Sequence, residues 1–178
     1  MRPTLKLALA AAMSAFLLTA CQPKQPAPRQ PRPVDPVTVP RPPIATQNYF
    51  RTAASVDLFV VRASQRALER GREARTRETA RLLLADHNGT AAQLSFAGRR
   101  LNLLPSAAML PVHQAMFEDL VASSNFDAAW RRQMLQMHEL AVKLHGDYAA
   151  RGASPTLRPV AASAERIERR HLDQLRGL

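Results

Sequence analysis

Four of the five histidines lie on apolar faces of predicted helices, and their imidazoles are the side chains best suited to chemistry. His87 aligns with leucines and alanines at three- and four-residue spacing, and His171 follows the apolar stripe of the last helix. His138 and His145 share one face of the helix between them. Imidazole binds zinc, copper, iron and nickel, and it is the side chain whose ordinary pKa lies nearest neutrality.

These positions allow two interpretations. In the preferred one, each histidine is a hydrogen-bonded core or boundary residue and the domain has no cofactor. In the alternative, His87, His138 and His171 share a transition-metal ion, with Glu168 as the carboxylate ligand one turn before His171. His138 and His145 are about 10 Å apart along their helix, from a rise of about 1.5 Å per residue, so they cannot hold one ion unaided.

The remaining candidates for chemistry are weaker. His113 falls near a predicted loop and is expected to be exposed, whereas Met134 and Met137 are expected to fill the core. No Ser-His-Asp spacing, phosphate-binding glycine loop or Cys-His cluster stands out in the chain. The sequence therefore favours a protein that is not an enzyme.

The elements that position these residues are helices. Apolar residues recur at three- and four-residue spacing from residue 46 to the end, with few glycines and no alternating strand pattern. Helices are predicted at about 48–70, 76–101, 112–122 and 126–151, with a last one after residue 154. Gly71 and Gly152 should end two of them, and Ser124 and Asp127 should form a capping box. Ser154 and Pro155 suggest the N-cap and first turn of the last helix, unless Pro159, which fits a regular helix badly, delays its start. Residues 46–178 are thus predicted to form an all-α, up-and-down antiparallel bundle of four main helices and a short one.

Five short motifs carry a resemblance to a known family. They are residues 57–59 (DLF), 85–87 (ADH), 126–127 (FD), 137–139 (MHE) and 170–172 (RHL). In this order and spacing they resemble a family of secreted bacterial proteins catalogued as domain of unknown function 4142. The resemblance implies a ferritin-like helical fold. Relatives often carry Glu directly after the aromatic residue of the first helix, where this chain has Val60.

A ferritin-like di-iron centre would require more acids than this pattern supplies. Such centres take a Glu from each of two helices and a Glu-x-x-His pair from each of the other two. Among the candidate histidines only Glu168 and His171 have that spacing, and the acid is missing at Val60.

The first 20 residues are predicted to be an export signal. Arg2 and Lys6 precede an apolar stretch, Leu7 to Leu18, that is long enough for a signal peptide and too short to span a membrane. The following Leu-Thr-Ala-Cys resembles the lipobox of bacterial lipoproteins, which implies cleavage before Cys21 and lipidation of its thiol. We therefore expect a lipid anchor on the periplasmic side of a bacterial membrane, with the outer membrane favoured because Gln22 follows the cysteine.

Residues 21–45 read as a linker. Nine of the 24 residues from 22 to 45 are prolines, which favour an extended chain that spaces the domain from the membrane. A proline-rich recognition segment is the alternative.

The mature chain is strongly basic. Removal of residues 1–20 leaves 23 basic and 14 acidic residues, a net charge of +9. Arg70, Arg72, Arg75 and Arg77 surround the first predicted turn and are candidates for anion binding. Export argues against nucleic acid as the partner, which leaves anionic lipids and cell-wall polymers. A solvated basic surface without a ligand is the simpler alternative.

The sequence thus predicts a membrane-tethered envelope lipoprotein with a basic helical bundle, acting in binding or in envelope stress rather than in catalysis. The alternative is a ferritin-like metal-binding protein that uses its inward-facing histidines.

Overall fold

The computed structural model describes residues 44–178, all of which belong to one helical unit. It contains α1 (Thr46–Arg70), α2 (Ala74–Arg99), α3 (Pro111–Ala122), α4 (Phe126–Arg151) and α5 (Arg158–Arg176), and no strand within that range. The predicted all-α class is confirmed, and the helix bounds agree with the predicted ones to about two residues. The predicted signal peptide, Cys21 and nearly all of the linker lie outside the described residues.

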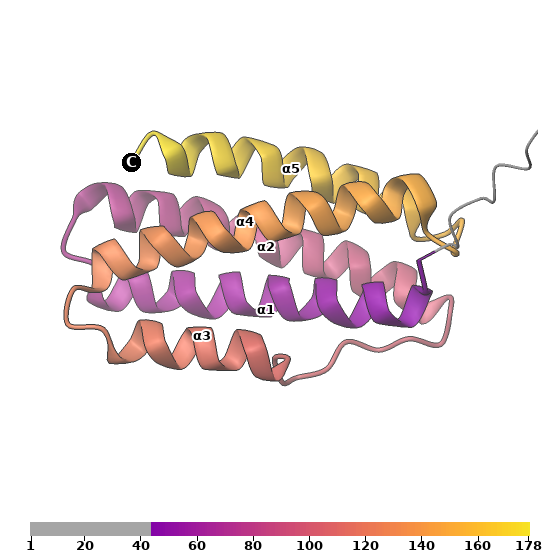
Figure 1. The fold of residues 1–178 in the computed structure, drawn as a ribbon, viewed down its shortest axis with the longest axis horizontal. Coiled ribbons are helices and arrows are strands. Elements are labelled where there is room, and N and C mark those ends of the chain that lie inside the picture. The colour runs from indigo at the N-terminus through magenta and orange to yellow at the C-terminus, as the bar shows by residue number, and fades with distance from the viewer. Residues whose placement is uncertain (1–43) are drawn as a thin grey trace, which may run out of the picture. The chain divides into compact units, whose positions relative to one another are not determined.

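The four long helices surround a common core, and α3 packs outside it (Figure 1). Helix α1 runs antiparallel to α2 and α4, and α5 runs antiparallel to the same two helices. The segment containing α3 carries the chain back along the bundle, so that α2 and α4 point the same way (Figure 1). The predicted bundle of four main helices and a short one is therefore confirmed, whereas its ferritin-like character stays a prediction.

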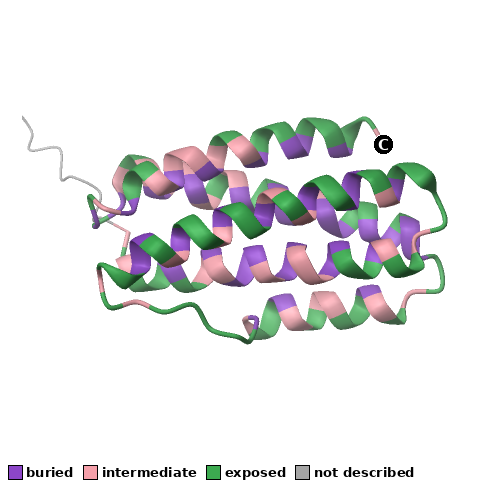
Figure 2. Ribbon diagram, turned by 180° about the vertical axis from the view of Figure 1, so that it is seen from behind, coloured by how far each residue is buried: buried purple, intermediate pink, exposed green. Residues whose placement is uncertain are grey.

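Buried residues form stripes along the inward faces of the helices (Figure 2). They divide into two apolar clusters. The larger contains Phe59, Leu83 and Trp130, and the smaller contains Tyr49, Leu94 and other residues near the opposite end. Along each long helix, the residues that separate the two clusters include buried polar side chains. The core of the bundle therefore has a polar layer between two apolar ones.

Glycine and proline set the helix ends as the sequence predicts. Gly71 and Gly152 follow the last residues of α1 and α4, and each donates its backbone N–H to a carbonyl of the preceding turn. The predicted N-cap of α5 at Ser154 is wrong, because the helix begins at Arg158 with Leu157 as its cap. Pro159 does delay the start: it occupies the first turn of α5, where its missing N–H costs nothing. None of the helices described is both long and apolar enough to span a membrane.

The predicted capping box at the start of α4 is wrong. The residue that caps α4 is Asn125, and it makes no side-chain capping hydrogen bond. The carboxylate of Asp127 instead accepts hydrogen bonds from the backbone N–H groups of Arg72 (3.1 Å) and Glu73 (3.3 Å), in the turn between α1 and α2. These donors outweigh the effect of burial and lower the pKa of Asp127. The carboxylate thus ties two turns together at one end of the bundle.

The start of the domain is fixed at the other end. Ile44, which the sequence placed in the linker, donates its N–H to the carbonyl of Arg151 (3.0 Å) and accepts a hydrogen bond from Ala153 (3.1 Å). The chain therefore joins the bundle beside the turn between α4 and α5.

Candidate metal centre

Three histidines and a glutamate meet in the polar layer of the bundle. His87 comes from α2, His138 from α4, and Glu168 and His171 from α5. One ligand atom from each of the four residues lies within 4.8 Å of the others, and all four side chains are buried. The structure thus brings together the four residues that the sequence proposed as metal ligands.

The closest approach is between two imidazoles. The Nε2 atoms of His87 and His138 are 3.4 Å apart. The Glu168 carboxylate lies 3.8 Å from the first and 3.6 Å from the second. Ring centroids of His87, His138 and His171 are 5.4 Å apart in every pairing, so the three imidazoles surround one point.

Each imidazole is oriented by an acceptor on its far side. His87 Nδ1 lies 2.9 Å from the carboxylate of Asp57, and His171 Nε2 lies 2.8 Å from that of Asp86. His138 Nδ1 donates to the backbone carbonyl of Met134 at 2.7 Å. Histidine ligands of metals commonly donate their second N–H to a carboxylate or a carbonyl in this way. The arrangement leaves Nε2 of His87 and Nε2 of His138 beside each other and beside Glu168, and Nδ1 of His171 without a partner.

The Asp57 carboxylate is itself held in place. Its Oδ1 atom also accepts a hydrogen bond from the hydroxyl of Thr90 at 2.9 Å, one turn after His87 on α2. Because Thr90 and His87 contact the same oxygen, α1 and α2 fix the orientation of the His87 ring together.

Three buried atoms of these four residues lack a hydrogen-bond partner. They are both carboxylate oxygens of Glu168 and Nδ1 of His171. Glu168 is only 1% exposed. An unpaired buried carboxylate is costly, because it has lost its water without gaining donors. A cation between these atoms and the two Nε2 atoms would supply the missing partner for all of them.

The charges of the cluster depend on one another. Burial lowers the pKa of His87, but the Glu168 and Asp57 carboxylates outweigh burial and raise it. Burial and the neighbouring His87 hold the pKa of His138 well below its usual value, so His138 is neutral and presents a lone pair. Burial likewise lowers the pKa of His171 and raises that of Glu168 to about 7.

These atoms fit one transition-metal ion. With metal–ligand distances of about 2.0–2.1 Å, the ligand atoms of a tetrahedral site are about 3.3 Å apart. The separations of 3.4, 3.6 and 3.8 Å among His87, His138 and Glu168 are close to that value. These three residues are therefore spaced nearly as a tetrahedral site requires, and the ligand atom of His171 lies within 4.8 Å of theirs.

The other histidines lie elsewhere. His145 contacts the hydroxyl of Tyr49 (2.9 Å) and does not join the cluster. The expected exposure of His113 is wrong: the side chain is buried, and its Nδ1 lies 2.7 Å from the hydroxyl of Ser55. His113 is in the first turn of α3, whose inward face rests on α1, so the proximity of a loop does not expose it.

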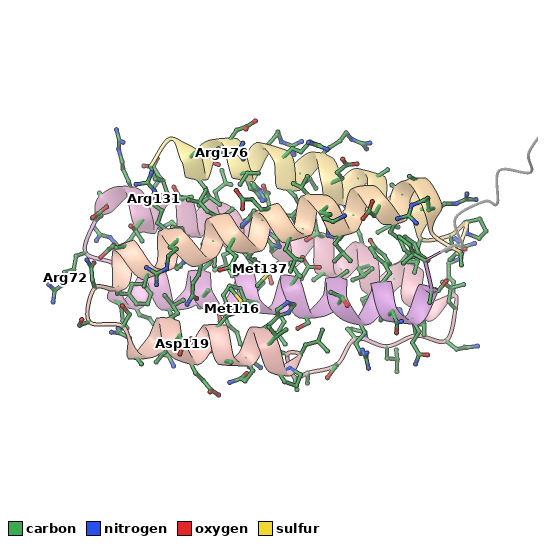
Figure 3. All side chains as sticks on the ribbon, viewed as in Figure 1. Arg72, Met116, Asp119, Arg131, Met137 and Arg176 are labelled. Carbon is green, nitrogen blue, oxygen red and sulfur yellow. The ribbon has the colours of Figure 1, made fainter. Side chains whose placement is uncertain are left out.

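The methionines have the predicted place in the core. Met134 and Met137 belong to the larger apolar cluster. Figure 3 shows Met137 and Met116 among the helices of the bundle, whereas Arg72 extends from one end of it.

The four arginines proposed as an anion site have different surroundings. The guanidinium of Arg70 donates to the carbonyls of Val121 and Ser123 and lies 4.9 Å from the centre of the Phe126 ring. That of Arg77 donates to the carbonyls of Gly71 and Arg72 at 2.8 Å each. Arg70 therefore joins α1 to the end of α3, and Arg77 joins α2 to the turn after α1. Arg70, Arg72 and Arg75 are exposed, whereas Arg77 is half-buried. Anion binding by this group stays a prediction.

Sequence reasoning missed two residues of the candidate site, Asp57 and Asp86. Both stand in motifs that carry the family resemblance, but neither was assigned a role. Asp57 offers a signal, since it interrupts the apolar face formed by Val56, Val60 and Ala63. Val60, where relatives often carry Glu, packs in the larger apolar cluster, and the acid that reaches the site from α1 is Asp57.

The family is decided by a match to residues 35–178, described as "Domain of unknown function (DUF4142)". The chain belongs to the DUF4142 family. The suspected resemblance is thereby confirmed, and it covers the whole helical bundle. No curated protein matches this DUF4142 chain significantly.

Solved structures with the same fold include several forms of one protein. "CopM in the Cu(II)-bound form" is 16% identical to this DUF4142 domain, with a TM-score of 0.64 over 76% of this chain and 95% of that one. "CopM in the apo form" is also 16% identical, with a TM-score of 0.62 over 75% and 95%. At this identity the likeness establishes a shared fold.

Proposed function

We propose that this domain binds a single transition-metal ion through His87, His138, His171 and Glu168. The observation that carries the proposal is a set of possible metal-ligand atoms at the centre of the bundle that have no hydrogen-bond partner. Nδ1 of His171 and both oxygens of Glu168 are buried without a partner, beside two Nε2 atoms whose rings are oriented by acceptors on their far sides. If these residues served only packing, we would expect such buried polar atoms to have hydrogen-bond partners within the protein.

The donor set favours a divalent ion. Three imidazoles and one carboxylate suit Zn(II), Cu(II), Fe(II) and Ni(II), whereas Cu(I) is selected by thiolates and thioethers. The fold supports copper as the first candidate, because CopM has been solved in forms described as Cu(II)-bound, Cu(I)-bound and Ag-bound. One carboxylate ligand fits a site for one ion and falls short of the four acids of a di-iron centre.

The experiment measures metal binding by the untagged full chain, purified in mild detergent. The chain carries Cys21→Ser so that no thiol competes with the proposed site for the metal. We expect one equivalent of Cu(II) or Zn(II) by calorimetry and elemental analysis. At a free metal concentration 100 times Kd, the free energy of unfolding should rise by about 2.7 kcal/mol.

Variants identify the ligands. His87→Ala and His138→Ala should lose the bound metal, whereas His145→Gln, on the same face of α4 but outside the cluster, should retain it. Metal-free protein whose melting temperature does not change with added copper, zinc, iron or nickel would contradict the proposal.

We further propose that the bundle is tethered to the envelope by lipid on Cys21, with the proline-rich segment as spacer. The support is the signal-like stretch and the lipobox-like Leu18–Cys21. A lipid-anchored bundle that binds metal in the periplasm would combine the envelope lipoprotein and the metal-binding protein that the sequence offers as alternatives.

A further inference from the structure

The four proposed ligands are buried, so an ion must pass between two helices of the bundle to reach them. His87 and His138 are fully buried, and Glu168 and His171 are almost so. Among residues 44–178, two acidic side chains outside the cluster form hydrogen bonds with its histidines. These are Asp57, which contacts His87, and Asp86, which contacts His171.

The two carboxylates differ in their access to solvent. The side chain of Asp57 is 5% exposed, whereas that of Asp86 is 44% exposed. Both bond to one proposed ligand at similar distances, 2.9 and 2.8 Å. The two carboxylates therefore make similar contacts with a proposed ligand, but Asp57 is buried in the bundle and Asp86 is exposed at its surface.

His171 connects the exposed carboxylate with the interior. Its Nε2 lies against Asp86, its buried Nδ1 has no partner, and one of its two nitrogens lies within 4.8 Å of the other proposed ligand atoms. The seam between α2 and α5, which these two residues bridge, is the least extensively packed of the four seams between the long helices. One imidazole thus separates a solvent-exposed carboxylate from the centre of the proposed site.

We propose that Asp86 is the outer binding residue for the ion, and that the ion reaches the centre between α2 and α5, past His171. This inference rests on the proposed function and adds its route. A hydrated divalent cation is first bound by the Asp86 carboxylate, which competes with the hydrogen bond from His171. The freed imidazole then accepts the ion and passes it to His87, His138 and Glu168.

The surrounding charges define the electrostatics of this route. From α5, Arg170 lies close enough to lower the pKa of His171, and its guanidinium donates to the carbonyl of Arg166. Arg170 therefore opposes the approach of a cation, and Asp86 favours it. Changing the two residues should have opposite effects on the rate of association.

The rival route is a pocket of about 180 Å³ between α1, α2 and the loop before α3. Asp57 lies in its wall, but most of its lining is apolar, including Ala54, Leu58 and Leu94. A hydrated ion gains little from such walls, because they cannot replace its lost water. The seam at Asp86 offers a charged ligand at the surface instead.

The experiment measures the rate of Cu(II) association by stopped-flow quenching of Trp130, the only tryptophan of the chain. Trp130 is eight residues before His138 on α4, about 12 Å along the helix axis, within reach of quenching by bound copper. The protein is the full chain carrying Cys21→Ser. The variants are Asp86→Asn, the matched control Asp57→Asn, and Arg170→Gln.

We expect Asp86→Asn to slow association about tenfold at low ionic strength and to weaken its dependence on salt. Asp57→Asn should speed dissociation, because it loosens the His87 ring from inside, and should slow association clearly less than Asp86→Asn does. Arg170→Gln should accelerate association. The inference would be overturned by Asp86→Asn associating at the parent rate, or by Asp57→Asn slowing association as much. Those outcomes leave the metal site itself intact, whereas failure of the parent to bind copper overturns both proposals.

Discussion

Glu168 and His138 face each other across the core with 3.6 Å between Oε2 and Nε2; the carboxylate oxygens have no hydrogen-bond partner, and Nε2 of His138 has only Nε2 of His87, at 3.4 Å. The imidazole is neutral and donates its only N–H to the carbonyl of Met134. Two groups that both offer lone pairs therefore lie side by side in a buried layer. This pairing is unfavourable in the metal-free protein and favourable around a cation.

Glu168→Gln should accordingly lose metal binding but stabilise the metal-free protein at high pH. The pKa of Glu168 is raised from 4.5 to about 7, so the folded protein binds more protons than the unfolded chain between those values. Stability therefore falls as pH rises through that window, and glutamine avoids the loss. We expect a gain of about 1–3 kcal/mol at pH 8, measured by urea denaturation with chelator present.

The gain should vanish at pH 4.5, where the parent carries a protonated Glu168. A variant that is less stable than the parent at pH 8 and still binds metal would show that Glu168 is a structural residue.

Trp130→Ala should destabilise the bundle by about 3–5 kcal/mol, because the ring is fully buried in the larger apolar cluster. Trp130→Phe is the matched control: it keeps an aromatic ring and removes an indole N–H that has no partner. Its cost should be clearly smaller. Thermal denaturation followed by circular dichroism measures both, and a loss below about 1 kcal/mol for Trp130→Ala would contradict its place in the core.

The helices could be predicted from the sequence because their signals are local. Apolar spacing, Gly71, Gly152 and Pro159 act within a turn or two of the chain, so they determine where helices begin and end. The same local signal predicts that three histidine side chains face the core, since each continues the apolar stripe of its helix: His87, His138 and His171.

The partners of these residues could not be predicted, because they depend on how one helix is aligned against another. That alignment decides that Asp57 faces His87 and that Asp86 faces His171. Asp127 has the spacing of a local cap, yet its carboxylate is used by the turn between α1 and α2. The spacing of apolar residues along one helix does not show how that helix is aligned against its neighbours.

Gly89→Ala should stabilise the protein by up to about 1 kcal/mol, since glycine is a poor helix former. Gly89 is exposed in the middle of α2, and a Cβ built there meets nothing within 4 Å. Gly98→Ala in the same helix is the control with the opposite sign. There a Cβ would overlap the ring of Phe50 and lie 2.9 Å from the carbonyl oxygen of Leu103. Equal effects of the two substitutions on the melting temperature would contradict this difference in packing.

Cys21→Ser should abolish lipid labelling and prevent normal processing of the signal segment. The expectation follows from the lipobox-like Leu18–Cys21 and from the absence of any other cysteine in the chain. Metabolic labelling with a fatty acid, followed by fractionation of the envelope, provides the measurement. Uptake of label by the variant would exclude Cys21 as the modified residue.

His145 should make the bundle sensitive to acid. It is buried beside Tyr49, whose hydroxyl lies 2.9 Å from Nδ1 and whose ring stacks on that of Tyr148. Burial lowers the pKa of His145 from 6.5 to about 4, so the folded protein keeps this ring neutral where the unfolded chain binds a proton. Stability is therefore lost as pH falls from 6.5 toward 4.

Between pH 7 and pH 5 the parent should lose about 2 kcal/mol more than His145→Gln, whose side chain does not titrate. Groups common to both proteins cancel in this difference. Tyr49→Phe removes the hydroxyl but leaves the buried imidazole, so it should keep most of the acid sensitivity while costing about 1 kcal/mol at pH 7. Urea denaturation at the two pH values, with chelator present, separates these cases. Parallel losses in the parent and in His145→Gln would show that another group is responsible for acid unfolding.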